Sequence, residues 1–174
     1  MRRPALLAAL LLLPATLAQA EPPRPQKLGD FQSWIAATYA EGGQKVCYAF
    51  ARASKSEPAR QNVLLTVTHR PSARDTVTVS AGYAFPRNAE AQAQVGGTEL
   101  PFYTHGSTAA ARDGAAAVRA FRNGREVTLR SPGANGRGQV VDVFPLAGFG
   151  AAYEAIGKEC PASAPAPASG GGRR

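Results

Sequence analysis

The sequence predicts a mainly β protein, an antiparallel β-sandwich or barrel-like domain with one C-terminal α-helix. Valine, threonine and tyrosine recur with the two-residue period of β-strands over much of the chain. Turn-forming residues separate these runs at roughly the eight- to twelve-residue spacing that is typical of sandwiches and barrels. One segment near the C-terminus has the spacing of an amphipathic helix instead.

Residues 1–20 have the features of a secretory signal peptide. Arg2 and Arg3 precede the apolar run ALLAALLLLPATLAQA, which ends with small residues at the positions that a signal peptidase requires. The run is shorter than the roughly 20 residues needed to span a bilayer, and Pro14 interrupts it, so it is not expected to remain as an anchor. We therefore expect cleavage after Ala20, export and no transmembrane span.

Residues 28–160 are expected to form a single β-rich domain, since their number is enough for one hydrophobic core. Residues 21–27 (EPPRPQK) form a linker of low hydrophobicity before it. Residues 161–174 (PASAPAPASGGGRR) contain only Pro, Ala, Ser, Gly and two closing Arg residues. Such a composition cannot bury enough apolar surface to fold, so a disordered tail is expected.

The chain is basic, with a net charge of +8 from 20 Lys and Arg against 12 Asp and Glu. Loss of the signal peptide removes Arg2 and Arg3 and leaves about +6, which suits an anionic envelope component such as lipopolysaccharide or phospholipid. The arginines are scattered and are not interleaved with aromatic residues. No specific nucleic-acid binding is therefore predicted.

Three β-hairpins are predicted in order along the domain. Residues 33–40 and 45–51 flank the turn EGGQ, residues 62–70 and 75–85 flank PSAR, and residues 125–131 and 139–146 flank PGANGRG. Between residues 88 and 117, short strands are possible at 94–95 and 99–103, without an assigned register.

A helix is predicted within GFGAAYEAIGKEC, because Phe149, Ala152, Tyr153 and Ile156 fall at the positions of one helical face. Cys160 lies four residues beyond Ile156 and so belongs to the same face.

The chain has two cysteines, Cys47 and Cys160. Cys47 shares a strand face with Ala49 and Ala51, whose small side chains leave room for the C-terminal helix, while the larger Val46, Tyr48 and Phe50 point to the other side. An even cysteine count in an exported domain favours a structural Cys47–Cys160 disulfide, worth about 4.7 kcal/mol in the chain-entropy model. Two distant cysteines fit neither a redox centre nor a zinc site, and a free, reactive Cys47 is the alternative.

An enzymatic alternative is a hydrolase that uses His105 as base and Ser107 as nucleophile, with Asp113 as the carboxylate. The chain lacks a Gly-x-Ser-x-Gly elbow, a Ser-x-x-Lys pair and a phosphate-binding glycine loop. We therefore interpret His105 as a loop histidine and predict no catalytic residue, no cofactor and no metal site.

Three further residues have structural interpretations. His69 continues the apolar face of its strand and is expected at the edge of the core, and Trp34 is expected in the core. Asp142 shares a strand side with Phe144 and Leu146, so it needs a buried hydrogen-bond partner, for example the first backbone N–H groups of the C-terminal helix.

Several of these segments together resemble a known family. The tryptophan strand 34–39, the strand VCYAF, the run GRGQVVDVFPLAGFGAAYEAI and the final cysteine resemble the invasion-associated locus B family of bacterial periplasmic proteins. The most specific part is the pattern D-x-F-x-L-x-G-F-x-A-A at residues 142–152. The resemblance implies an exported β-sandwich-like domain of unestablished biochemical activity, in a family with one member tied to entry into red blood cells. Many members have an additional central cysteine pair that this chain lacks, which indicates a divergent branch and gives no ground for a virulence role.

The function predicted is a periplasmic, non-enzymatic binding or envelope-associated module. Its partner is expected to be an envelope protein or an anionic envelope component. The alternatives are the His105–Ser107 hydrolase and a structural subunit of a larger envelope complex with an exposed apolar patch.

Overall fold

The computed structural model describes residues 24–162, so the predicted signal peptide and most of the predicted tail lie outside the described residues. These residues form one antiparallel sheet of 11 strands in the order β1-β2-β3-β5-β6-β9-β8-β7-β10-β11-β4. The strands are β1 (Gln26–Phe31), β2 (Trp34–Glu41), β3 (Gln44–Arg52), β4 (Lys55–Glu57), β5 (Leu64–Arg70), β6 (Ala73–Ser80), β7 (Glu90–Val95), β8 (Thr98–His105), β9 (Thr108–Ala111), β10 (Glu126–Pro132) and β11 (Gln139–Pro145). Two helices complete the fold, α1 (Gly114–Asn123) and α2 (Phe149–Glu159).

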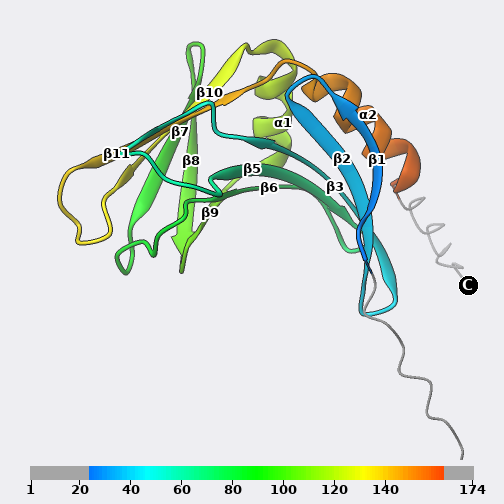
Figure 1. Cartoon of the computed structure of the whole chain (residues 1–174), viewed down its shortest axis with the longest axis horizontal. Helices are drawn as coiled ribbons and strands as arrows, with labels where there is room; N and C mark the ends of the chain where they lie inside the picture. The colour runs from blue at the N-terminus through cyan, green and yellow to red at the C-terminus, as the bar shows by residue number, and fades with distance from the viewer. Residues whose placement is uncertain (1–23, 163–174) are drawn as a thin grey trace, which may run out of the picture.

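The sheet is bent into an arch and does not close into a barrel (Figure 1). Strands β1, β2 and β3 form one end of the arch, and β7, β8, β10 and β11 form the other. Helix α2 packs against β1, β2 and β3, and α1 packs against β6, β8 and α2. Both helices cover the outer side of the arch, so the inner face of β2, β3 and β5 carries no helix (Figure 1).

The hydrophobic core lies between the helices and the outer face of the sheet. Cys47, Ala49 and Ala51 of β3 are buried there, as the alternation of strand side chains predicts. Trp34 is fully buried, as predicted, with its ring centroid 4.9 Å from that of Phe149 of α2. Its indole N–H donates to the Pro145 carbonyl at 3.0 Å, which satisfies the buried polar group and joins β2 to the end of β11.

The structure confirms the mainly β antiparallel fold class and the C-terminal helix. The three predicted hairpins correspond to β2–β3, β5–β6 and β10–β11. The possible central strands are also present and extend further than predicted, as β7 and β8. Strand β6 ends at Ser80, earlier than predicted, and Gly82 then adopts a left-handed φ of 73°.

Four elements were not predicted. The short strands β4 and β9 have too few residues to show an alternating pattern. Strand β1 begins at Gln26, inside the stretch predicted as a linker. Helix α1 was missed although Asp113 caps it, its side chain accepting from the Ala116 N–H at 2.9 Å. Neither α1 nor α2, the helices of residues 24–162, has the length and apolar character that crossing a bilayer requires.

Candidate functional site

The two cysteines form the predicted disulfide, with a Cα–Cα distance of 6.0 Å across a sequence separation of 113. Cys47 is fully buried in β3, and Cys160 is the residue at which α2 ends. The bond therefore joins the end of α2 to the sheet and has a structural place in the fold.

The residues of the hydrolase alternative do not come together as a catalytic set. His105 ends β8 and Ser107 lies in the turn before β9, and both are exposed. Among the described residues their side chains share no hydrogen bond, and the Asp113 carboxylate is engaged as the cap of α1. The arrangement lacks the nucleophile–base contact that a hydrolase of this type needs.

His69 lies in a buried polar cluster between the sheet and α2. Its ring is fully buried; Nε2 is 3.1 Å from Asp75 Oδ1 and Nδ1 is 2.9 Å from Arg74 Nη2. The Tyr153 hydroxyl of α2 donates to the same Asp75 oxygen at 2.6 Å, and the Arg74 guanidinium donates to the Cys160 carbonyl at 2.5 Å. Burial, together with the Asp75 carboxylate, raises the pKa of Tyr153 to about 12.

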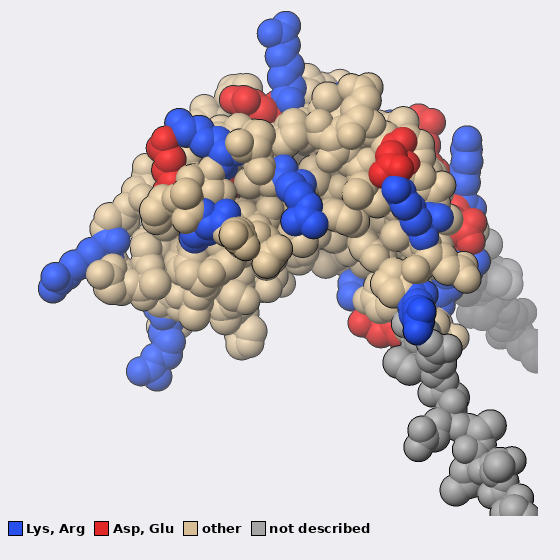
Figure 2. Space-filling view, in the orientation of Figure 1, with Lys and Arg blue, Asp and Glu red and all other residues tan. Residues whose placement is uncertain are grey.

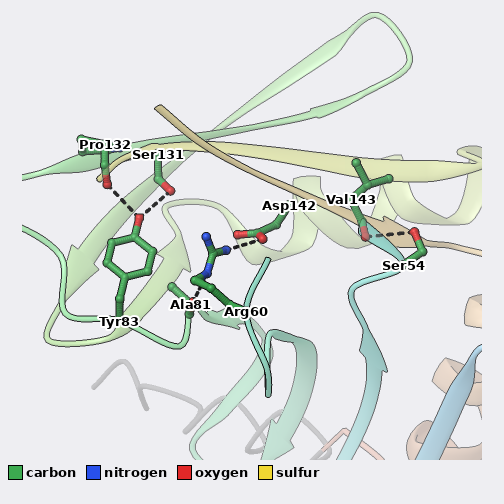
Figure 3. Close-up of polar contacts among 8 residues, drawn as sticks. All are labelled: Ser54, Arg60, Ala81, Tyr83, Ser131, Pro132, Asp142 and Val143. Atoms are coloured by element: carbon green, nitrogen blue, oxygen red, sulfur yellow. Dashed lines mark hydrogen bonds and ion pairs between the residues drawn. The ribbon is translucent and has the colours of Figure 1, made fainter. Parts of the chain in front are cut away.

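A second buried cluster joins β10 and β11 to the loop before β5 and the segment after β6 (Figure 3). Arg60, in the loop between β4 and β5, donates from Nε to the Ala81 carbonyl at 3.0 Å and pairs through Nη2 with Asp142 of β11. Beside it, the Tyr83 hydroxyl donates to the Pro132 carbonyl of β10 at 2.8 Å. The guanidinium lies 5.2 Å from the centroid of the Tyr83 ring, so one cation contacts both an anion and an aromatic face.

Asp142 has the buried partner that was predicted for it, but the partner is a side chain. The carboxylate is fully buried, and burial raises its pKa, although Ser56 and Arg60 act in the opposite direction. The suggested contact with the start of α2 is wrong, because the N-cap of α2 is Gly148 and no side chain accepts a capping hydrogen bond there. The His69 cluster is therefore closed by partners inside the fold. In the second cluster, Arg60 Nη1 and Asp142 Oδ2 are buried without a hydrogen-bond partner among the described residues.

The inner face of the arch carries a groove of about 460 Å³. It is lined by Pro25, Tyr39, Tyr48, Phe50, Leu64, Thr66 and Thr68. The rings follow one another across the face: Tyr39 and Tyr48 are 5.6 Å apart edge to face, and Tyr48 and Phe50 are 6.1 Å apart and stacked. None of the lining residues carries a charge, so the groove is an apolar surface with hydroxyl groups among its rings.

The charged residues lie outside the groove. Lysine and arginine side chains are spread over the visible face and do not gather in one patch (Figure 2). Several are paired with acids, as in Lys27–Asp30, Lys45–Glu159, Lys55–Glu57, Arg70–Glu41 and Arg112–Glu90. Within residues 24–162, no three His, Cys, Asp or Glu side chains lie close enough together to hold a metal ion.

The groove was not identified from the sequence, although a signal for it was present. Tyr48 and Phe50 alternate with the buried Cys47 and Ala49, which places two aromatic rings on the opposite face of β3. Arg60 carried no comparable signal, because its partner Asp142 is 82 residues away in the chain.

The chain is similar to one described family and to a solved structure. The family model described as invasion associated locus B (IalB) protein matches residues 34–157, from β2 into α2. Among solved structures, the chain is similar to the crystal structure of invasion associated protein b from Bartonella henselae, with 18% identity and a TM-score of 0.58. That similarity covers 74% of this chain and 92% of the other, and shows a shared fold. No curated protein matches this chain.

Proposed function

This chain belongs to the invasion associated locus B family, and on that premise we propose that it is an exported, non-enzymatic binding module of the bacterial periplasm. The partner proposed is an envelope protein that docks an apolar segment into the groove on the inner face of the arch. The export signal expected at residues 1–20 supports the location.

The groove is the observation that carries this proposal. Tyr39, Tyr48 and Phe50 present three rings on a sheet face that no helix covers, and aromatic side chains supply much of the energy in protein interfaces. Because the lining residues are uncharged, the complementary partner surface is apolar rather than anionic.

The distribution of basic residues supports a protein over a polyanion. A polyanion is held by a continuous basic patch, since its affinity comes from many simultaneous contacts with charged groups. Here the basic side chains are scattered and several are paired with acids at short range, for example Arg70 with Glu41 at 2.8 Å.

The test is a pull-down from the periplasm and the outer membrane with mature wild-type protein at low and at high salt. Captured proteins are identified and then tested against Tyr48→Ala and Phe50→Ser, which remove rings from the groove. Tyr103→Ala is the matched control, because Tyr103 is an exposed aromatic residue on β8, 48% accessible and outside the groove.

We expect one identified envelope protein to be retained at both salts by wild type and by Tyr103→Ala. The groove variants are expected to lose it, because an apolar contact is insensitive to ionic screening and depends on the rings. Retention that disappears in high salt, or that is equal in all variants, contradicts docking in the groove.

Export is tested separately by releasing the periplasm from intact cells and measuring the mass of the protein. A mature chain that begins at Glu21 is the expected result. A chain that stays in the cytoplasm with residues 1–20 attached contradicts the proposed location.

A further inference from the structure

The buried cluster around His69 joins the sheet to the C-terminal end of α2. We define the helix-end contact as His69, Arg74, Asp75, Tyr153 and the carbonyl group of Cys160. It lies on the helix-covered side of the sheet, whereas the groove lies on the opposite face. The behaviour of the helix-end contact is therefore independent of the proposed function.

A β-bulge brings the groups of this contact together. Thr68 pairs with Thr76 and Arg70 with Ala73, which leaves His69 opposite two residues, Arg74 and Asp75. A bulge of this kind turns two consecutive side chains toward one neighbour. Asp75 has a left-handed φ of 54° there, and its carbonyl oxygen is so close to Gly114 of α1 that a Cβ on that glycine would lie 1.7 Å away. Helix α1 therefore fixes the bulge from behind.

The hydrogen bonds assign the protonation state of His69. A guanidinium group only donates, so Nδ1 of His69 accepts from Arg74 and carries no proton. The single ring proton is then on Nε2, which donates to the Asp75 carboxylate at 3.1 Å. The ring is neutral in this arrangement, and it is packed edge-on against the Tyr153 ring at 5.1 Å.

A proton on Nδ1 is incompatible with the Arg74 contact. It would place a donor against a donor and bring two positive charges to 2.9 Å, away from bulk water. Arg74 would then leave, and with it the 2.5 Å hydrogen bond to the Cys160 carbonyl at the end of α2. Asp75, whose oxygen is already shared with Tyr153, opposes this change only in part.

We propose that the helix-end contact is acid-sensitive, and that protonation of His69 releases the last turn of α2 from the sheet while the Cys47–Cys160 disulfide keeps it tethered. The groups that face the ring are Arg74 and Asp75 of β6, Tyr153 and the Ile156 carbonyl of α2, and Cys47, which pairs with His69 across β3 and β5. Arg122 of α1 lies 4.7 Å from the Tyr153 ring and adds a further positive charge behind it.

The direction of the effect follows from the surroundings of His69. Burial and the neighbouring Arg74 lower the pKa of His69, against the raising influence of Asp75. Because the pKa of His69 is lower in the contact than after release, the released ring binds a proton more readily. The contact therefore has its full stability above the ordinary histidine pKa of about 6.5. Its stability is lost as the pH falls through the lowered pKa.

The experiment is an NMR titration of the mature protein from pH 7.5 to pH 5, with amide hydrogen exchange measured at each step. The chain has two histidines, so His105→Gln assigns the ring signals by removing one of them. We expect His69 as the Nε2–H tautomer at pH 7.5. We also expect the Cys160 amide, which donates to Ile156 at 2.9 Å, to titrate with the midpoint of the His69 ring. After correction for intrinsic rates, exchange of this amide should be faster at low pH than at pH 7.5. The expected acceleration is about tenfold for each pKa unit by which the released His69 ring exceeds the ring in the contact.

Two variants separate the contact from a general acid effect. His69→Asn keeps an acceptor for Arg74 but does not titrate, so the acid response of the Cys160 amide should disappear, whereas His105→Gln should retain it. Arg74→Gln should raise the His69 midpoint and weaken protection of the Cys160 amide already at pH 7.5. If His69→Asn does not fold, Arg74→Gln and the wild-type titration still test whether protonation of His69 releases the end of α2.

Either of two results overturns the proposal. One is titration of His69 with no change at the Cys160 amide. The other is an Nδ1–H tautomer at pH 7.5, since that tautomer excludes the hydrogen bond from Arg74 to the ring.

Discussion

Asp142 is fully buried, and the charge that balances it comes from Arg60, 82 residues earlier in the chain. The alternation along its strand is enough to predict that Asp142 faces the core, and the burial of a carboxylate is enough to predict a partner. The identity of the partner depends on how the loop between β4 and β5 crosses the arch, which no local pattern encodes. The same holds for Trp34, whose burial was predicted and whose bond to Pro145 was not.

Arg60→Ala is expected to lower the free energy of unfolding by about 3–5 kcal/mol, because it leaves an unpaired buried carboxylate. Adding Asp142→Asn should recover part of that loss, since it removes the charge and keeps the shape. Urea unfolding of the single and double variants measures both effects.

The control for this pair is Arg112→Ala, which breaks the Arg112–Glu90 pair, whose side chains are 50% and 67% exposed. An exposed pair contributes at most about 1 kcal/mol, so this variant should unfold close to wild type. Equal losses for Arg60→Ala and Arg112→Ala would show that the buried Arg60–Asp142 pair stabilises the fold no more than an exposed pair does.

Six of the seven defined positions in the pattern at residues 142–152, on the end of β11 and the start of α2, have a structural reason, whereas Ala151 is exposed. Phe144, Leu146, Phe149 and Ala152 are buried in the core, and Asp142 pairs with Arg60. Gly148 has a left-handed φ of 91°, and a Cβ there would lie 1.9 Å from the Phe31 carbonyl oxygen. This segment therefore holds α2 on the sheet.

Gly148→Ala should destabilise the protein by at least about 1–3 kcal/mol, the usual cost of a strained backbone, with the contact to Phe31 in addition. Gly150→Ala is the matched control two residues later, where a Cβ meets nothing within 4 Å. Because alanine favours a helix over glycine, that variant should gain up to about 1 kcal/mol. Thermal unfolding of both compares them directly, and a tolerated Gly148→Ala would disprove the close approach.

Elements were predictable from the sequence where they are long and regularly patterned. The hairpins β2–β3, β5–β6 and β10–β11 and helix α2 each show a full period of their pattern. Helix α1 is the alanine-rich segment GAAAVRAFRN, in which Ala117, Val118 and Phe121 are buried on one face and Arg119 and Arg122 are exposed. This spacing is that of an amphipathic helix, so a periodic signal was present although only two of the buried side chains are large. Its Asp113 cap and the following Gly124 were further signals.

For the whole molecule, the disulfide is a covalent link between β3 and the end of α2, the last helix. It closes a loop across a separation of 113 residues and holds α2 against β3. The sequence predicted the pair because small residues surround Cys47 on its strand face. The groove on the other face was not predicted. Tyr48 and Phe50 form a groove only together with Tyr39, Leu64 and Thr66 of the neighbouring strands, and the pattern of β3 alone does not show that pairing.

Replacing both cysteines, as Cys47→Ala with Cys160→Ala, should lower the free energy of unfolding by about 2–5 kcal/mol, near the value for a loop of roughly a hundred residues. Urea unfolding measures the loss, and reduced wild-type protein should fall to the same stability. A variant as stable as oxidised wild type would show that packing alone holds α2.

The most direct test of the central claim is photo-crosslinking in living cells. A benzophenone amino acid replaces Tyr48 in the groove of one strain and the exposed Tyr103 in another, each with a ring of similar size in the same fold. If the inner face of the arch is the binding surface, the probe at position 48 crosslinks to one envelope protein and the probe at 103 does not. Crosslinks to that protein from position 103 alone, or none from position 48, would contradict the groove as the binding surface.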